Sequence, residues 1–247
     1  MALIEAEGVH VRFGDRVVLE DIHLAVPEGQ LHGIMGPNGA GKTTFFNVLT
    51  GRVKPSRGRI RLAGADIAGL SPHAIANKGV ARSFQVMTLF DEFTARDNVM
   101  TALPAFRARG FDALHAVAGD RGLAQEADDV LASVGLGDKV AVMARQLPYG
   151  ERRALEIAVA LAQRPRVLCL DEPTSGLGSD GRARLADLVA KLKGALTIVI
   201  IEHDMEFLFS LADMISVIHW GQVIARGTPA ELKANPWVKS SNLGRLN

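Results

Sequence analysis

Runs of alternating and continuous apolar residues open the chain. RVVLE (16–20) and IHLAV (22–26) have the spacing of half-buried strands, and LHGIM (31–35) is a short apolar run followed by glycine. Short runs of apolar and β-branched residues bounded by turn residues are typical of β-strands. We therefore predict that residues 1–35 form a series of short strands.

Helices and strands then follow in turn. TTFFNVLTG (43–51) has helical spacing and closes on glycine, which commonly ends a helix. GRIRL (58–62) predicts a strand. Ser71, followed by proline, resembles an N-cap with proline in the first helical position, and Gly79 would end this short helix. VARSFQ (80–85) then returns to a strand.

The pattern changes between residues 87 and 163. This segment is rich in alanine, leucine and charged residues at helical spacing, and it contains no convincing strand pattern. We interpret residues 87–163 as a helical subdomain inserted into a single domain that spans residues 1–247. Residues 1–86 and 164–247 would form the core around it.

Strands alternate with helices again after this insertion. VLCLD (167–171) and TIVII (197–201) are continuous apolar runs of the kind that is buried inside a sheet, and the segment between them has helical spacing. A hairpin around Gly221 and a capping-box pattern from Thr228 to Glu231 complete the series. The alternation predicts an α/β fold with a mainly parallel sheet, which adjoins an antiparallel β portion at the N-terminus and the helical insertion.

Composition and charge narrow the possible partners. The 247 residues are 48% hydrophobic and 22% charged, with a formal net charge of +1, so nothing in this balance favours nucleic acid as a partner. Cys169, the only cysteine, lies in an apolar run, and we expect it to be a small buried side chain. The sequence has no continuous apolar stretch of about 18 residues, and its early acidic residues do not fit a secretory signal. We expect a soluble protein.

A glycine-rich loop carries the strongest chemical signal. Residues 36–43, GPNGAGKT, match the pattern G-x-x-x-x-G-K-[ST] between a predicted strand and a predicted helix. Glycines let successive backbone N–H groups face phosphate oxygens, and the start of the helix adds partial positive charge. Lys42 is expected to reach the β- and γ-phosphates, and the Thr43 hydroxyl is expected to bind Mg²⁺. The pattern predicts a P-loop NTPase core, which alone leaves kinases, GTPases, helicases and transporters open.

Polar residues at the ends of two predicted strands extend this site. Asp171 and Glu172 follow the apolar run VLCL. A carboxylate at the end of a buried strand suits coordination of Mg²⁺ beside a phosphate loop, and Glu172 would polarise the attacking water as a general base. A strand that simply ends at two solvated acids is the alternative interpretation. His203 follows the run TIVIIE at the same predicted edge, where it could donate a hydrogen bond to the γ-phosphate.

In the order and spacing of these residues the chain resembles the ATP-binding subunits of ABC transporters over essentially its whole length. The resemblance identifies residues 36–43 as Walker A and 167–171 as Walker B, with Glu172 as the catalytic carboxylate and His203 as the switch histidine. It implies a Mg-ATP-dependent ATPase that pairs with a second ATP-binding subunit beneath a membrane permease, at the cytoplasmic face of the inner (plasma) membrane.

The resemblance also assigns residues that spacing alone would not find. Gln85 matches the Q-loop glutamine, which in the family touches the magnesium–water shell and the hinge of the helical subdomain. Phe13 occupies the place of the aromatic residue that stacks on adenine. The full set implied for nucleotide binding is Phe13, Gly36, Pro37, Asn38, Gly39, Ala40, Gly41, Lys42, Thr43 and Thr44, and the set implied for the metal is Thr43, Gln85 and Asp171.

The signature motif, which in the family contacts the ATP of the partner subunit, departs from its consensus Leu-Ser-Gly-Gly-Gln. The corresponding residues here are Leu147, Pro148, Tyr149, Gly150 and Glu151. Proline in the serine position removes a hydroxyl and a backbone donor. The D-loop consensus Ser-Ala-Leu-Asp reads SGLG at 175–178. We hypothesise a heterodimer in which the ATP site on this chain's own P-loop carries most of the turnover; the alternative is that Tyr149 merely packs and both sites work comparably.

A narrower resemblance concerns the transported solute. ARSFQ (81–85), YGERRALEIAVAL (149–161) and IEHDMEF (201–207) are similar to one of the two ATPases of branched-chain amino acid uptake systems, and to their relatives for urea and aromatic acids. In those systems an extracytoplasmic binding protein delivers the solute to the permease. An exporter of lipid or lipopolysaccharide is the alternative, and a soluble ABC ATPase outside transport, or a nucleotide switch without turnover, has less support.

The resemblance also places the contact with the membrane partner. Residues 86–100 are expected to form the groove for a cytoplasmic helix of the permease, with VMTLF (86–90) and Phe93 as its apolar lining. The alternative is that these side chains belong to the core of the helical subdomain.

Overall fold

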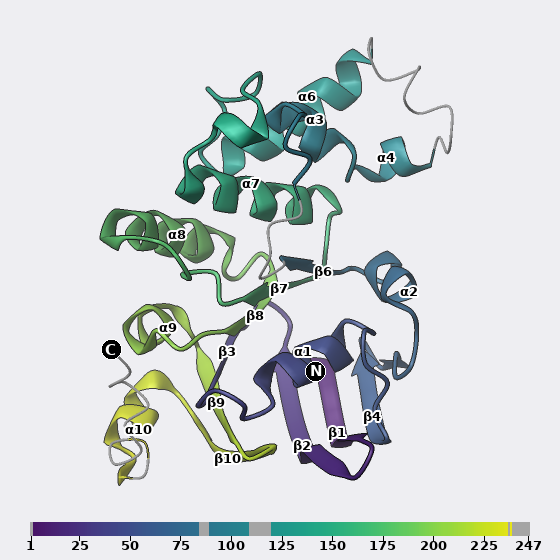
Figure 1. The fold of residues 1–247 in the computed structure, drawn as a ribbon, viewed down its shortest axis with the longest axis vertical. Helices are drawn as coiled ribbons and strands as arrows, with labels where there is room; N and C mark the ends of the chain where they lie inside the picture. The colour runs from purple at the N-terminus through teal and green to yellow at the C-terminus, as the bar shows by residue number, and fades with distance from the viewer. Residues whose placement is uncertain (1, 84–88, 109–119, 237, 239–247) are drawn as a thin grey trace.

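The computed structural model describes residues 2–83, 89–108, 120–236 and 238. Among these residues the strands form two sheets (Figure 1). The first has the order β2-β1-β4-β5 and is antiparallel; it consists of β1 (Ala2–Phe13), β2 (Arg16–Pro27), β4 (Arg57–Leu62) and β5 (Ala65–Asp66). The antiparallel β portion predicted at the N-terminus is confirmed.

The second sheet has the order β10-β9-β3-β8-β7-β6. Its strands are β3 (Leu31–Met35), β6 (Val80–Ser83), β7 (Val167–Asp171), β8 (Thr197–Ile201), β9 (Met214–His219) and β10 (Gln222–Gly227). All neighbouring pairs are parallel except β9 with the edge strand β10. The mainly parallel sheet is therefore confirmed, and the carboxyl ends of β3, β7 and β8 meet at one edge.

The prediction of separate short strands at 16–20 and 22–26 is wrong, since both runs belong to β2. Asp21, between them, has a positive φ of 56°. The register moves from Val9↔Ile22 to Val11↔Leu19 at this point, which places an extra residue on β2. A β-bulge bends a strand without ending its pairing, so the change in the apolar pattern reflects the bulge and not a turn.

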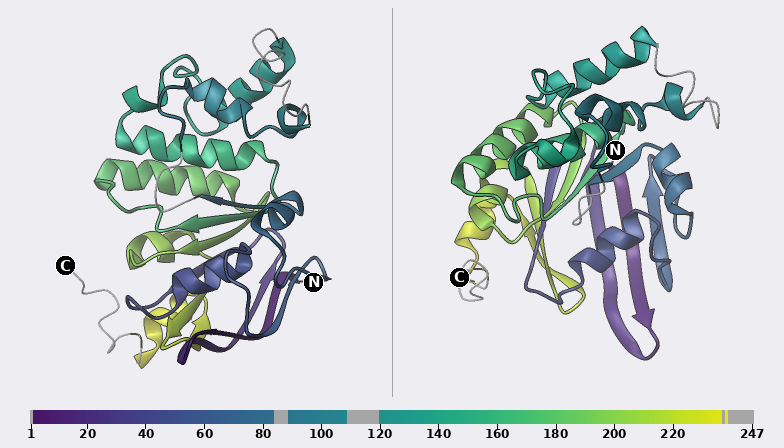
Figure 2. Two further views of the ribbon diagram at one scale, coloured as in Figure 1. Left: turned by 45° about the vertical axis from the view of Figure 1, so that its right-hand side comes forward. Right: turned by 45° about the horizontal axis from the view of Figure 1, so that its top comes forward.

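Helices lie on both sides of the parallel sheet (Figure 2). They are α1 (Lys42–Leu49), α2 (Pro72–Asn77), α3 (Ala95–Met100), α4 (Pro104–Arg107), α6 (Arg121–Ser133), η2 (Ala144–Gln146), α7 (Tyr149–Ala162), α8 (Ser179–Leu192), α9 (Met205–Leu211) and α10 (Pro229–Ala234). Ser71 caps α2 and Thr228 forms the predicted capping box of α10, because their side chains accept backbone N–H groups of the first turn.

Each face of the parallel sheet has its own core. On one face the sheet packs with α1 and the antiparallel sheet, through residues such as Phe45, Ile34 and Val199. On the other face it packs with α7, α8 and α9 and with the helices of segment 87–163, through residues such as Leu155 and Leu168. Helices α3, α4, α6 and α7 gather at one end of the molecule in Figure 1. The described part of segment 87–163 is helical, as predicted. The boundaries of the helical subdomain, at residues 87 and 163, stay a prediction.

Candidate nucleotide site

The glycine-rich loop joins β3 to α1 at the carboxyl edge of the parallel sheet. Gly36 and Gly41 have φ values of 153° and 105°, which residues with a side chain rarely adopt. A Cβ on Gly36 would lie 2.0 Å from the carbonyl oxygen of Ile218, and one on Gly41 would lie 2.6 Å from Leu19 Cδ2. Both glycines are therefore required by close packing as well as by backbone conformation.

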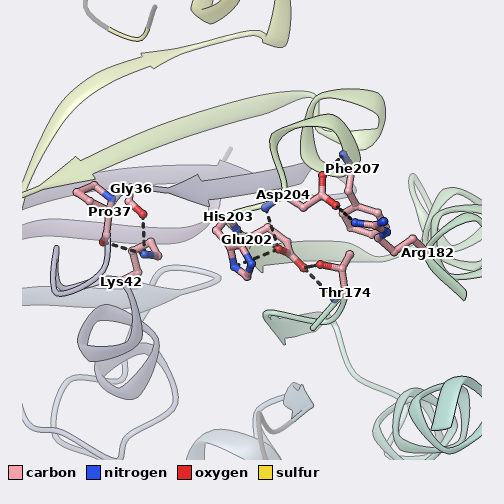
Figure 3. Close-up of polar contacts among 9 residues, drawn as sticks. All are labelled: Gly36, Pro37, Lys42, Thr174, Arg182, Glu202, His203, Asp204 and Phe207. Atoms are coloured by element: carbon pink, nitrogen blue, oxygen red, sulfur yellow. Dashed lines mark hydrogen bonds and ion pairs between the residues drawn. The ribbon is translucent and has the colours of Figure 1, made fainter. Parts of the chain in front are cut away.

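Lys42 is the first residue of α1 and is only 5% exposed. Its Nζ donates hydrogen bonds to the carbonyl oxygens of Gly36 at 2.7 Å and Pro37 at 3.0 Å (Figure 3). Burial lowers the pKa of Lys42, and the negative charges of Glu172 and Asp171 partly counter that shift. The ammonium group is thus held inside the loop that it would share with a phosphate.

A cavity of about 380 Å³ opens beside this loop. It is lined by Phe13, Arg16, Val18, Gly39, Ala40, Gly41, Lys42, Thr43 and Thr44. Phe13, at the end of β1, is 53% exposed, so its ring is available at the cavity wall. The structure thus brings Phe13 together with the second half of the glycine loop, although they are far apart in the sequence. Arg16 and Val18 were not predicted, because nothing in the sequence pattern marks the start of β2 as part of a cavity.

Asp171 ends β7 and is 1% exposed. Arg82 of β6 pairs with it, since Nη2 lies 2.5 Å from Asp171 Oδ2. The other terminal nitrogen of Arg82 donates to Asn47 Oδ1 at 2.7 Å and Thr50 Oγ1 at 3.2 Å, both in or just after α1. Arg82 therefore ties the end of β7 to the helix that carries Lys42. The sequence did not predict this role of Arg82, because a lone arginine in a strand gives no sign of its partner.

Glu172 and His203 lie at the ends of the neighbouring strands β7 and β8. Glu172 has a positive φ of 45°, which is costly for a residue with a side chain, and its N–H donates to the Ile201 carbonyl at 2.9 Å. The side chain of His203 is 56% exposed. In Figure 3, His203 lies between the Lys42 loop and Glu202. The predicted convergence of these residues at one sheet edge is thus present in the fold, while their catalytic roles stay predictions.

The candidate signature residues surround the start of α7. Pro148 occupies the N-cap position without a side-chain hydrogen bond, and the hydroxyl of Tyr149 donates to the Ser175 carbonyl at 3.0 Å. Leu147 is buried, whereas Gly150 is exposed and Glu151 lies in the first helical turn. These residues do not line the cavity beside Lys42. Pro148 to Glu151 instead border a second cavity of about 620 Å³ against α8.

Two groups of predictions remain outside this geometry. Gln85, assigned to the Q-loop, lies outside the described residues, as do residues 86–88 of the proposed contact with the permease. Asn38 is exposed in the glycine loop but does not line the cavity.

Cys169 is fully buried as predicted, and burial raises the pKa of its thiol to about 12.

The part of the chain that the structure describes contains no cluster of three or more His, Cys, Asp or Glu side chains suited to hold a metal by itself. Among the helices of the described residues, none has both the length and the apolar character needed to span a membrane.

The fold and site define a P-loop nucleotide-binding protein. Residues 19–175 match the ABC transporter family. The chain is 41% identical to the high-affinity branched-chain amino acid transport ATP-binding protein BraF of Pseudomonas aeruginosa, with 98% of each chain covered. It is 36% identical to LivG of Escherichia coli, which has the same description, again with 98% of each chain covered.

Solved structures agree with the sequence relatives. The ADP conformation of MJ1267, an ATP-binding cassette of an ABC transporter, superposes with a TM-score of 0.86 at 26% identity and covers 99% of this chain and 100% of that one. A nucleotide-free ATP-binding cassette gives a TM-score of 0.83 at 25% identity, with 100% of both chains covered. The chain therefore belongs to the ABC transporter family and is an ATP-binding ATPase subunit of that family.

Proposed function

We propose that this chain is the ATP-hydrolysing subunit of an importer for branched-chain amino acids. The observation that carries the proposal is the meeting of the Lys42 loop, Asp171, Glu172 and His203 at one sheet edge. The relatives that match the chain over nearly full length are named for branched-chain amino acid transport. An exporter has less support, because these relatives, which are named for branched-chain amino acid transport, align with 98% of this chain and 98% of their own length.

ATP binding would use the cavity beside the glycine loop. Phe13 would stack on adenine, and the backbone N–H groups of residues 36–44 would surround the phosphates. Lys42 would exchange its hydrogen bonds to the Gly36 and Pro37 carbonyls for bonds to phosphate oxygens. Because its ammonium group is already buried and aligned, little reorganisation would accompany this exchange.

Mg²⁺ fits the oxygen donors at this edge. Thr43 presents a hydroxyl in the first turn of α1, and Asp171 presents a carboxylate at the end of β7. Mg²⁺ prefers one or two such protein oxygens together with water and phosphate oxygens, so a dedicated protein cage is not needed. When bound, the ion would neutralise charge on the β- and γ-phosphates. Gln85 is the third expected contributor.

Hydrolysis would depend on Glu172 and His203. Glu172 would orient and polarise the attacking water, and the imidazole of His203 would donate a hydrogen bond to the γ-phosphate. The exposed imidazole follows β8, and the buried Lys42 follows the glycine loop after the neighbouring strand β3. They could therefore approach the same phosphate group from two sides.

A second ATP-binding subunit would complete the pocket, with a different subunit as the expected partner. Signature residues 147–151 do not line the cavity beside Lys42 in this chain, so they are available to a nucleotide held by another chain. Gly150 and the start of the 14-residue helix α7 would supply backbone N–H groups there. Nucleotide shared between two such surfaces would favour the closed dimer, and hydrolysis would release it.

The contact with the permease is proposed at the described part of residues 86–100. The rings of Phe90 and Phe93 lie 5.0 Å apart and are 55% and 37% exposed. Aromatic residues are enriched at protein interfaces relative to the rest of the surface. We place the subunit at the cytoplasmic face of the inner (plasma) membrane, bound to the permease, while an extracytoplasmic binding protein would deliver the solute.

Reconstitution of the chain with its permease and second ATP-binding subunit tests the proposal. Proteoliposomes with ATP, Mg²⁺ and the solute-binding protein on the appropriate sides should accumulate labelled leucine, isoleucine or valine. The Glu172→Gln variant should assemble but lose most uptake. Robust ATP hydrolysis without uptake of any branched-chain amino acid would refute the solute assignment and leave the ATPase intact.

A further inference from the structure

Glu202 is a fully buried carboxylate between β8 and His203. Its side chain is 0% exposed, and its backbone N–H donates to the Ile34 carbonyl at the end of β3 at 3.2 Å. A buried carboxylate is costly unless hydrogen bonds satisfy its oxygens. The hydrogen-bond partners of the Glu202 carboxylate therefore indicate its structural role.

Two different loops supply those partners (Figure 3). Glu202 Oε1 accepts the backbone N–H of Thr174 at 2.8 Å and the Thr174 hydroxyl at 2.5 Å. Glu202 Oε2 accepts the backbone N–H groups of His203 at 2.9 Å and Asp204 at 3.2 Å. Each carboxylate oxygen thus holds one loop, and the planar group fixes the separation between them.

The Thr174 loop begins at the candidate catalytic residue and leads to the surface near α7. Ser175 N–H donates to the Glu172 carbonyl at 3.1 Å, and the Ser175 carbonyl accepts the Tyr149 hydroxyl at 3.0 Å. Residues 176–178, which follow Ser175, border the second cavity together with Tyr149. A continuous series of contacts therefore leads from Tyr149 through Ser175 and Thr174 to Glu202.

The His203 loop is held on its other side by Asp204. One oxygen of Asp204 caps α9 by accepting the Phe207 N–H at 3.0 Å, and the other lies 3.2 Å from Arg182 Nη1 of α8. Within this loop the imidazole of His203 makes no hydrogen bond comparable to those of Asp204, because its Nδ1 lies 3.8 Å from Glu202 Oε2. The backbone bonds of Glu202 are therefore the direct constraint on where the exposed ring of His203 is presented.

From this geometry we infer that Glu202 is a positioning residue that couples the placement of His203 to the 174–178 loop. Contact of a second subunit with Tyr149 or residues 175–178 would shift that loop. The shift moves Thr174 and is passed to His203 through the carboxylate of Glu202. Because its side chain is fully buried, Glu202 itself would not touch a bound nucleotide. The inference rests on the proposed role of His203 in hydrolysis.

Kinetics of the assembled complex test this coupling. In Glu202→Gln the amide nitrogen cannot accept a hydrogen bond, so one loop loses its acceptor. Misplacement of a reacting group by about 1 Å can cost on the order of 100-fold, so we expect kcat to fall at least about 10-fold. The Kd for ATP, which depends on the Lys42 loop, should change less than about twofold. The matched control Asp204→Asn keeps an oxygen for the α9 cap and should retain kcat within about threefold.

A double-mutant cycle shows whether Glu202 acts through His203. If it does, Glu202→Gln combined with His203→Ala should be no slower than His203→Ala alone, because the second loss has nothing left to act on. Independent, multiplicative losses would overturn the inference. Thr174→Val should reproduce part of the loss in kcat caused by Glu202→Gln, whereas Thr174→Ser, which keeps the hydroxyl, should retain the wild-type kcat.

Hydrogen exchange on the full-length chain gives a readout that does not depend on turnover. Glu202→Gln should speed exchange of the amides in both 174–178 and 203–206, whereas exchange in β3 should be unchanged. A change confined to one loop would overturn the coupling. Failure of the proposed function would look different, because the wild-type complex would then hydrolyse no ATP and Lys42→Ala would have nothing to abolish.

Discussion

His32 shows how a buried polar residue makes the fold sensitive to pH. It lies fully buried in β3, with Nε2 2.9 Å from Ser216 Oγ of β9. Burial, and to a lesser extent the charge of Arg226, lowers the pKa of His32 from 6.5 to about 3. The folded protein therefore keeps this imidazole neutral over a range in which the unfolded chain takes up a proton.

The sign of the resulting pH effect follows from that difference. As the pH falls below about 6.5, the unfolded state binds a proton that the native state excludes, so His32 lowers the free energy of unfolding by up to about 1.4 kcal/mol per pH unit. Urea denaturation at pH 7, 6 and 5 should show a shallower pH dependence for His32→Gln than for the wild type. His23→Gln, at an exposed histidine, is the control. Equal slopes for wild type and His32→Gln would contradict this account.

Arg82 gives a second prediction at the scale of single residues. It forms a buried ion pair with Asp171, and Arg82→Met would leave that carboxylate without its positive partner. We expect a loss of about 3–5 kcal/mol in the free energy of unfolding. Arg145→Met removes the exposed pair with Glu92 and should cost less than about 1 kcal/mol. Chemical denaturation of the three proteins would decide, and a similar loss for both variants would show that burial of the pair has no special weight.

Among the helices and strands, the short helices of residues 87–163 depend on their caps. Thr94 forms a capping box with Asp97 at the start of α3, a helix of 6 residues beside the exposed Phe93. Thr94→Ala should lower the free energy of unfolding by about 1 kcal/mol, whereas Thr94→Ser should retain most of it. Thermal denaturation measures both. A Thr94→Ser variant as unstable as Thr94→Ala would show that the methyl group, and not the cap, is what matters.

The elements also show which sequence signals were sufficient. Continuous apolar runs predicted β3, β7 and β8, because these signals act locally. For the same reason, glycine, proline and capping residues predicted the ends of α1 and α2 and the starts of α2 and α10. The β-bulge at Asp21 was missed, since a bulge interrupts the alternation of side chains in the same way as a strand end. Pairing across long distances leaves no local mark, so the partnership of Arg82 with Asp171 could not be predicted.

The candidate site was predictable to a similar extent. The glycine loop and the acids after β7 have a recognisable spacing, and the family resemblance added Phe13. Glu202 was overlooked although it also follows an apolar strand, as Asp171 does. The general signal, an acid directly after a continuous apolar run, could have marked both residues. Arg16 and Val18 line the cavity only because β2 folds back beside the loop.

At the scale of the whole molecule, the two cavities suggest unequal ATP sites in a heterodimer. This chain has Pro148 at the N-cap of α7, and its Tyr149 is bonded to Ser175 of the same chain. The site that receives these residues should turn over more slowly than the site on this chain's own loop. In the reconstituted complex, Glu172→Gln should therefore remove most ATPase activity, and the equivalent change in the other subunit should remove less. Equal losses would contradict the hypothesis.

We propose that the loop around Lys42 binds the nucleotide whose hydrolysis powers transport by the assembled complex. The most direct test of this proposal is ATP hydrolysis by the purified complex with Mg²⁺, measured beside the Kd for ATP. Lys42→Ala should assemble normally, weaken ATP binding and reduce hydrolysis at least about 100-fold. Unchanged binding and hydrolysis in Lys42→Ala would show that this loop is not the nucleotide site.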